Sequence, residues 1–235
     1  MNIGNDGNKN VLLFHDFILG ADLKMSATET LNTGTTTVGI KTKDGVILAS
    51  ERRATMGHII AHSHVQKVFA ISDNIGMTIA GLVGDAQLMV RWLETEVELY
   101  SIKRGAPMTV KAAATLVANV IRQGFYLGLI VGGYDAKGGH IFSIDGAGGC
   151  IEDDYVSVGS GSLFALGVLE GKYKEGMTED EGVDLAISAL NSAIRRDSAS
   201  GDGMLISVIN KKGTKQIPED EIRARAAELG FRYPN

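Results

Sequence analysis

The pattern of hydrophobic and polar positions becomes regular at about residue 35. Four short segments are rich in β-branched and apolar residues and are bounded by turn residues, which is typical of strands. These segments are residues 36–42, 46–53, 67–72 and 76–82. Turn sequences at Lys43-Asp44-Gly45 and Asp73-Asn74 predict that they pair as two β-hairpins. The His-rich residues 54–66 are predicted to connect the two hairpins.

Beyond residue 84 the apolar residues recur at helical spacing. Thr109 is predicted to cap one helix, and Thr178-Glu179-Asp180-Glu181 is a capping-box sequence for another. The predicted helices are residues 85–102, 110–121, 162–169, 178–196 and 218–229, and the further strands are residues 129–134, 140–145, 155–158 and 204–210. Because strands and helices come in blocks, the order predicts an α+β fold rather than βαβ winding.

Composition and charge narrow the function classes. The chain has 235 residues, of which 44% are hydrophobic and 22% charged, as in an ordinary soluble globular protein. Its net charge is −5 with no basic block, so nucleic-acid binding has no electrostatic support. The single cysteine, Cys150, excludes an intrachain disulfide and fits a reducing compartment.

Residues 1–34 differ in amino-acid composition from the rest of the chain. The first ten positions are rich in Asn and Gly, and an apolar stretch follows at residues 11–19. That stretch is short for a membrane span and is interrupted by His15 and Asp16, so we predict neither a signal peptide nor an anchor. We expect a cytoplasmic protein. No repeat or Pro-rich linker divides the remainder, and residues 35–235 are predicted to form one domain.

The segment Thr33-Gly34-Thr35-Thr36-Thr37-Val38-Gly39-Ile40 is central to the function. Taken alone it is an ordinary strand with a flexible glycine at its entry. It is followed by four further motifs, in this order: Glu51-Arg52-Arg53-Ala54, Ile79-Ala80-Gly81-Leu82-Val83-Gly84-Asp85, Gly159-Ser160-Gly161-Ser162 and Arg196-Asp197-Ser198-Ala199-Ser200-Gly201. Together they resemble the β subunits of the 20S proteasome, most closely the archaeal type, from about residue 33 to residue 230.

The resemblance implies the four-layer αββα sandwich of N-terminal nucleophile hydrolases and a threonine-type endopeptidase activity. Residues 1–34 would be a propeptide, removed autocatalytically between Gly34 and Thr35. The new terminus would then supply both a hydroxyl nucleophile and an α-amine, whose pKa of about 7.7–8.0 suits a general base. The branched Cβ of Thr35 restricts its side-chain orientation.

The resemblance also implies roles for other residues. Lys67 would lower the pKa of the amine and hydroxyl, and Glu51 would pair with Lys67. The backbone N–H of Gly81 would stabilise the oxyanion. The alternative for Gly81 is a plain turn glycine, and for the Lys–Glu pair a surface ion pair. The residues that would hold the amine and relay its proton are Ser160, Asp197 and Ser200.

Five apolar residues match positions that line the pocket for the substrate side chain preceding the cut: Ala54, Val65, Phe69, Ile79 and Val83. Because all five are apolar, we expect a chymotrypsin-like preference for bulky hydrophobic side chains. The alternative is that these residues belong to the core.

The resemblance further implies assembly and partners. β subunits of this family form seven-membered rings stacked between rings of α-type subunits, and an ATP-dependent unfoldase delivers unfolded protein substrates to the enclosed chamber. No cofactor, nucleic acid or membrane is implied.

Alternative functions are open at this point. His58, His62 and His64 have spacings that could bind zinc, but no acidic or cysteine ligand accompanies them, so we predict no metal site. Another N-terminal nucleophile amidohydrolase, the bacterial two-ring relative and a non-catalytic ring subunit are the other candidates. A peptidase assay of Thr35→Ala separates an enzyme from a structural subunit.

Met25 lies shortly before the predicted cut. We hypothesise that translation begins at Met25, which would leave residues 25–34 as the propeptide. Mass spectrometry of a Thr35→Ala precursor expressed from its native gene tests this, because detection of residues 1–24 would exclude it.

Overall fold

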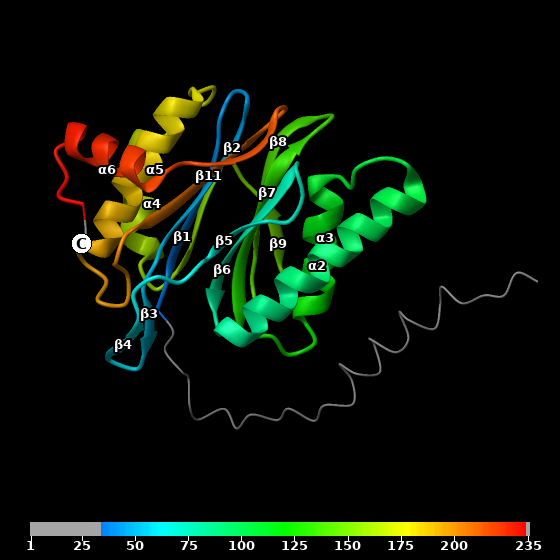
Figure 1. The fold of residues 1–235 in the computed structure, drawn as a ribbon, viewed down its shortest axis with the longest axis horizontal. Helices are drawn as coiled ribbons and strands as arrows, with labels where there is room; N and C mark the ends of the chain where they lie inside the picture. Colours follow the sequence, from blue (N-terminus) through cyan, green and yellow to red (C-terminus); the bar gives the residue numbers. More distant parts are fainter. Residues whose placement is uncertain (1–33, 234–235) are drawn as a thin grey trace, which may run out of the picture. The chain divides into compact units, whose positions relative to one another are not determined.

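The computed structural model describes residues 34–233 (Figure 1). The hypotheses on the leader, the apolar stretch and Met25 concern residues outside this range. The strands are β1 (Thr36–Lys41), β2 (Gly45–Glu51), β3 (Ala54–Met56), β4 (Ile59–His62), β5 (Val68–Ala70), β6 (Ile75–Gly81), β7 (Leu127–Asp135), β8 (Gly138–Ile144), β9 (Cys150–Glu152), β10 (Tyr155–Gly159), β11 (Met204–Asn210) and β12 (Gly213–Gln216). The helices are α2 (Val83–Arg104), α3 (Val110–Ile121), α4 (Ser162–Lys172), α5 (Glu179–Ile194) and α6 (Glu219–Glu228).

Two antiparallel five-stranded sheets form the centre of the molecule. The first has the strand order β10-β1-β2-β11-β12, and the second has the order β5-β6-β7-β8-β9. Figure 1 shows α4, α5 and α6 on the outer side of the first sheet and α2 and α3 on the outer side of the second. The small β3–β4 hairpin projects from the edge of this arrangement.

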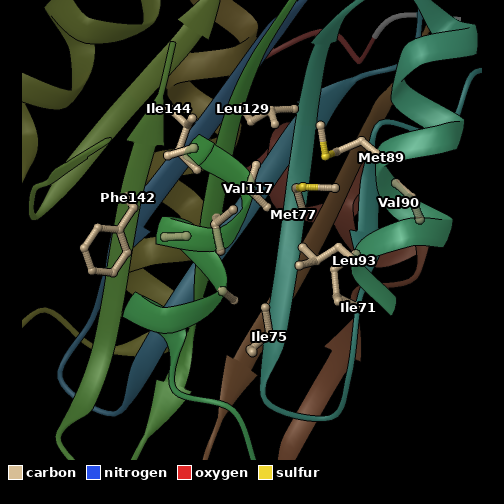
Figure 2. Packing of buried hydrophobic residues seen from close by; sticks show 14 of the residues in the cluster. Ile71, Ile75, Met77, Met89, Val90, Leu93, Val117, Leu129, Phe142 and Ile144 are labelled. Atoms are coloured by element: carbon tan, nitrogen blue, oxygen red, sulfur yellow. The ribbon is translucent and has the colours of Figure 1, made fainter. Parts of the chain in front are cut away.

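Three hydrophobic clusters hold the four layers together. The first joins α2 and α3 to the second sheet, and Figure 2 shows Met89 and Leu93 of α2 packed toward Met77 of β6. The second joins α4, α5 and α6 to the first sheet. The third lies between the sheets, where Leu48 of β2 meets Ile130 of β7 and Ile141 of β8. A fully buried side chain of this kind contributes roughly 1.5–3 kcal/mol, so the layers are mutually stabilising. The predicted αββα sandwich is confirmed.

The predicted helix caps are present. The Thr109 hydroxyl accepts a hydrogen bond from the backbone N–H of Ala112 at 3.3 Å, and α3 begins at the next residue. Thr178 and Glu181 form a complete capping box at the start of α5. Each cap satisfies N–H groups that have no partner within the helix.

The connector predicted for residues 54–66 is wrong in part, because it contains the β3–β4 hairpin. Residues 59–62 are all exposed, so they lack the half-buried alternation that marks a strand in sequence. Strands β9 and β12 were also not predicted. β9 is exposed along its length and β12 contains no large apolar residue, so neither gives a hydrophobic signal.

Outside the first sheet, the end of the described chain is tied to β11. The buried Tyr233 hydroxyl accepts a hydrogen bond from the backbone N–H of Met204 at 2.9 Å. Arg223 of α6 lies over the Tyr233 ring, 4.8 Å from its centre. The hydrogen bond holds Tyr233 against the strand that pairs with β2.

Candidate active site

Thr35 lies immediately before β1, which runs between β10 and β2. Glu51 is the last residue of β2, and Lys67 directly precedes β5 of the other sheet. All three side chains are buried, with exposed fractions of 4% for Thr35, 0% for Glu51 and 5% for Lys67. The ends of three strands therefore bring a hydroxyl, a carboxyl and an amine together inside the protein.

Lys67 is at the centre of this group. Its Nζ donates to Thr35 Oγ1 at 3.1 Å, and it also bonds to Glu51 Oε1 and to the backbone carbonyl of Arg53. The Thr35 hydroxyl in turn donates to the Gly34 carbonyl oxygen at 2.7 Å. The hydroxyl thus lies between an amine donor and the carbonyl of the preceding residue.

Backbone groups hold the Glu51 carboxyl in place. Its Oε2 accepts hydrogen bonds from the backbone N–H of Arg53 at 2.7 Å and of Gly201 at 3.0 Å. Its Oε1 accepts from the backbone N–H of Thr36 at 3.3 Å. A buried carboxylate needs such donors, because an unpaired one is very costly. They also fix the direction in which Glu51 faces Lys67.

Burial sets the electrostatics of this pair. It lowers the pKa of Lys67 below the ordinary value for lysine, and the adjacent Glu51 acts in the opposite sense. Burial likewise raises the pKa of Glu51, against the attraction of Lys67 and its hydrogen bonds. Lys67 is therefore easier to deprotonate than an exposed lysine, and it lies next to the Thr35 hydroxyl.

A second polar group lies on the other side of Thr35. The backbone N–H of Thr35 donates to Ser160 Oγ at 3.1 Å. Ser160 Oγ and Ser200 Oγ both donate to Asp197 Oδ2, at 2.6 Å and 2.7 Å. Ser160 lies in the turn between β10 and α4, and Asp197 and Ser200 lie in the loop between α5 and β11. Ser160 contacts the main-chain nitrogen that a cut after Gly34 would free, and Asp197 links Ser160 to Ser200.

Arg53 was not assigned a role from the sequence, although it lies in one of the motifs. Its guanidinium binds Asp202 at 2.7 Å and 3.2 Å and the Ser198 carbonyl at 2.9 Å. Asp202 has a φ of +62°, a left-handed conformation that is uncommon for aspartate. Arg53 therefore clamps the loop that carries Asp197 and Ser200, and the signal for it was its position two residues after Glu51.

Gly81 ends β6 with a φ of +138°, which favours glycine, and a Cβ there would collide with the carbonyl of Tyr126. Two residues earlier, the N–H of Ile79 donates to the Lys67 carbonyl at 3.0 Å. Gly81 therefore lies on the strand beside the Lys67 segment. Its role as the oxyanion donor stays a prediction.

The five predicted pocket residues lie in different environments. Ile79 is buried, and Phe69 packs against the same core cluster. Ala54 and Val65 are half-buried, whereas Val83 is 44% exposed. Part of the set is therefore core, as the alternative interpretation held, and its role in specificity stays a prediction.

The three histidines of the metal alternative, His58, His62 and His64, are all exposed. Within residues 34–233 no three His, Cys, Asp or Glu side chains gather in a way that could hold a metal ion. None of the helices in that range has the length and apolar character needed to cross a bilayer.

Comparisons with known proteins agree with this architecture. Residues 31–209 match the protein family described as "Proteasome subunit". The chain is similar to proteins named "Proteasome subunit beta" from several archaea. The one from Thermoplasma acidophilum is 52% identical over 208 residues, which cover 86% of this chain and 98% of that protein. Those from Methanocorpusculum labreanum and Picrophilus torridus are 51% and 50% identical, covering 82% and 86% of this chain and 93% and 98% of the relatives.

Proposed function

This chain belongs to the proteasome subunit family, and from that membership we propose that it is a catalytic β subunit with Thr35 as its nucleophile. One observation carries the proposal. The buried Thr35 hydroxyl lies 3.1 Å from Lys67 Nζ, which is itself paired with the buried Glu51. A structural subunit has no need to bury a lysine against a threonine hydroxyl, because burying such charges is costly.

The first step of the proposal is cleavage between Gly34 and Thr35. The Thr35 hydroxyl already contacts the Gly34 carbonyl at 2.7 Å, next to the bond to be broken. A Cβ on Gly34 would collide with the side chain of Ala199, so only glycine fits this close approach. Attack by the hydroxyl oxygen on the Gly34 carbonyl carbon would form an ester and break the Gly34–Thr35 peptide bond. The hydroxyl proton would pass to the Thr35 nitrogen, which leaves as the free amine. Water would then hydrolyse the ester and release residues 1–34 as the propeptide.

The freed amine would be the general base for peptide hydrolysis. Its nitrogen would occupy the position from which Thr35 now donates to Ser160, beside Asp197. In the reaction the amine takes the hydroxyl proton while Thr35 Oγ bonds to the substrate carbonyl carbon. Collapse of the tetrahedral intermediate breaks the peptide bond, and the proton passes to the leaving amine. Water then cleaves the acyl ester and regenerates Thr35.

Lys67 and Gly81 would stabilise charge during this sequence. The Lys67 amine donates to the attacking oxygen and so favours its deprotonated form. The backbone N–H of Gly81 is proposed to receive the oxyanion, a contribution worth about 3 kcal/mol per donor in comparable sites.

The substrates are proposed to be unfolded proteins, cut after bulky hydrophobic residues. Support comes from the apolar character of Ala54, Val65 and Val83, which are at least partly accessible. Peptides that differ only at the residue before the cut test this, and faster cleavage after charged residues would contradict it.

By the same family membership we propose seven-membered β rings between α rings in the cytoplasm, served by an ATP-dependent unfoldase.

The decisive experiment compares wild type with Thr35→Ala in particles assembled with the α-type subunit. Wild type is expected to begin at Thr35 by N-terminal sequencing and to hydrolyse fluorogenic peptides. Thr35→Ala is expected to retain residue 34 and to lose activity, since it lacks the nucleophile. Undiminished hydrolysis by Thr35→Ala would refute the proposed function.

A further inference from the structure

Thr36, the residue after the proposed nucleophile, has a hydroxyl enclosed in the protein. Its side chain is completely buried, and Thr36 Oγ1 lies 2.7 Å from Ser200 Oγ. A Cβ on Gly161 would collide with this same oxygen, so the turn before α4 closes over it. The hydroxyl has been placed with one specific partner, and its role is separate from that of Thr35.

Counting hydrogens assigns the direction of this bond. A carboxylate oxygen only accepts, and each serine hydroxyl has a single proton to give. Asp197 Oδ2 receives the Ser200 proton at 2.7 Å and the Ser160 proton at 2.6 Å. Ser200 Oγ therefore has no second proton to offer and accepts from Thr36 Oγ1. The backbone N–H of Thr35 can only donate, so Ser160 Oγ accepts from it.

The result is one hydrogen-bonded array with consecutive residues at its two ends. It runs from Thr36 Oγ1 to Ser200, then to Asp197 and Ser160, and finally to the nitrogen of Thr35. The backbone N–H of Thr36 also donates to Glu51, the partner of Lys67. Thr36 thus contacts both the group around the Thr35 nitrogen and the group around the Thr35 hydroxyl.

We propose that Thr36 is a positioning residue, which holds Ser200 and, through it, the Asp197–Ser160 arm that orients the nitrogen of Thr35. The inference rests on the proposed function, because the oriented nitrogen is the proposed base. Without the Thr36 hydroxyl, Ser200 loses its donor and can turn away from Asp197. Asp197 then keeps the Ala199 N–H at its Oδ1 and Ser160 at its Oδ2 but loses Ser200, so the base is less well aligned with the hydroxyl.

Thr37 provides a matched control. It is also a completely buried threonine in β1, but its hydroxyl donates to the Val158 carbonyl of β10 at 3.1 Å. Removing either hydroxyl makes the same chemical change, one residue apart, in the same strand. Only the Thr36 change disturbs the array around Thr35.

The experiment compares Thr36→Val, Thr36→Ser and Thr37→Val in particles assembled with the α-type subunit. We expect Thr36→Val to lower kcat roughly fivefold to tenfold with KM unchanged, the scale of one hydrogen bond. Thr36→Ser keeps the hydroxyl and should stay within about twofold of wild type, as should Thr37→Val. Melting temperature and gel filtration check that each variant folds and assembles.

A background variant tests the route through Ser200. In Ser200→Ala, adding Thr36→Val should lower kcat no further, since the partner is already gone. An equal fall in both backgrounds would overturn the inference, as would equal effects of Thr36→Val and Thr37→Val or no effect of Thr36→Val. Thr35→Ala distinguishes failure of the proposed function from failure of this inference. If Thr35→Ala is active, the proposed function is refuted. If Thr35→Ala is inactive but the Thr36 variants do not behave as expected, only the positioning role of Thr36 is refuted.

Discussion

Replacing Lys67 with methionine should separate stability from catalysis. Methionine fills a similar volume but leaves Glu51 as a buried carboxyl without its amine partner. Breaking a buried ion pair in this way costs about 3–5 kcal/mol. For a chain of this size each kcal/mol lowers the melting temperature by about 2–4 °C, so the subunit should melt about 10 °C lower.

The second change is Glu51→Gln in the Lys67→Met background. It removes the unpaired charge, while the glutamine oxygen can still accept from Arg53 and Gly201. About half of the lost stability should return. The recovery is incomplete because the glutamine NH2 group takes the place of Glu51 Oε1 and faces the Thr36 N–H, which is also a donor. Peptidase activity should not return, because Thr35 Oγ1 still lacks the Lys67 amine that donated to it.

The assay is a thermal melt of the isolated subunit beside peptide hydrolysis by the assembled particle. A double variant that melts as low as Lys67→Met would show that the unpaired Glu51 charge is not the cause of the lost stability. A wild-type kcat in Lys67→Met would show that Lys67 is a structural partner of Glu51 and has no part in the reaction.

Three further predictions concern single residues. Gly81→Ala should abolish peptidase activity in the fluorogenic assay and destabilise the fold by about 1–3 kcal/mol, because of its positive φ and the collision with Tyr126. Tyr233→Phe leaves the Met204 N–H unpaired and should cost about 1–3 kcal/mol in urea unfolding, whereas a cost near zero would mean that water replaces the hydroxyl. Burial raises the pKa of Tyr173 to about 12. As the pH rises, Tyr173 therefore loses its proton in the unfolded chain before it does so in the folded protein. The contribution of Tyr173 to the free energy of unfolding is complete below about pH 10 and is lost between about pH 10 and 12. In urea unfolding, the free energy of unfolding should fall less between pH 9 and pH 11 in Tyr173→Phe than in wild type. An equal fall in the two proteins would contradict the raised pKa of Tyr173.

The sequence predicted elements whose apolar residues face a core, and the structure explains why others escaped. Val183 and Leu190 mark α5 because they pack against the first sheet. The β3–β4 hairpin gives no such signal, since Ile59 and Ile60 are 65% and 47% exposed. Hydrophobic periodicity reports burial, so an exposed hairpin carries none of it.

For the candidate site, family resemblance supplied residues that the structure does bring together: Thr35, Glu51, Lys67, Ser160, Asp197 and Ser200. Their catalytic roles stay predictions. Thr36 and Arg53 were not assigned, because their partners Ser200 and Asp202 are far away in the sequence. Only the register of β1 and the course of the loop after α5 make these pairs, and neither is readable from local pattern.

The separation of the partners along the chain has a consequence for timing. Thr36 precedes Ser200 by 164 positions, and Thr35 precedes Ser160 by 125. The ribosome synthesises the two threonines long before the two serines, so a nascent chain that ends before Ser200 cannot form this array. Any reaction of Thr35 that needs the array must wait until translation is almost complete. If Thr35 makes the proposed cut after Gly34, the order of synthesis keeps that cut from occurring on an incomplete chain.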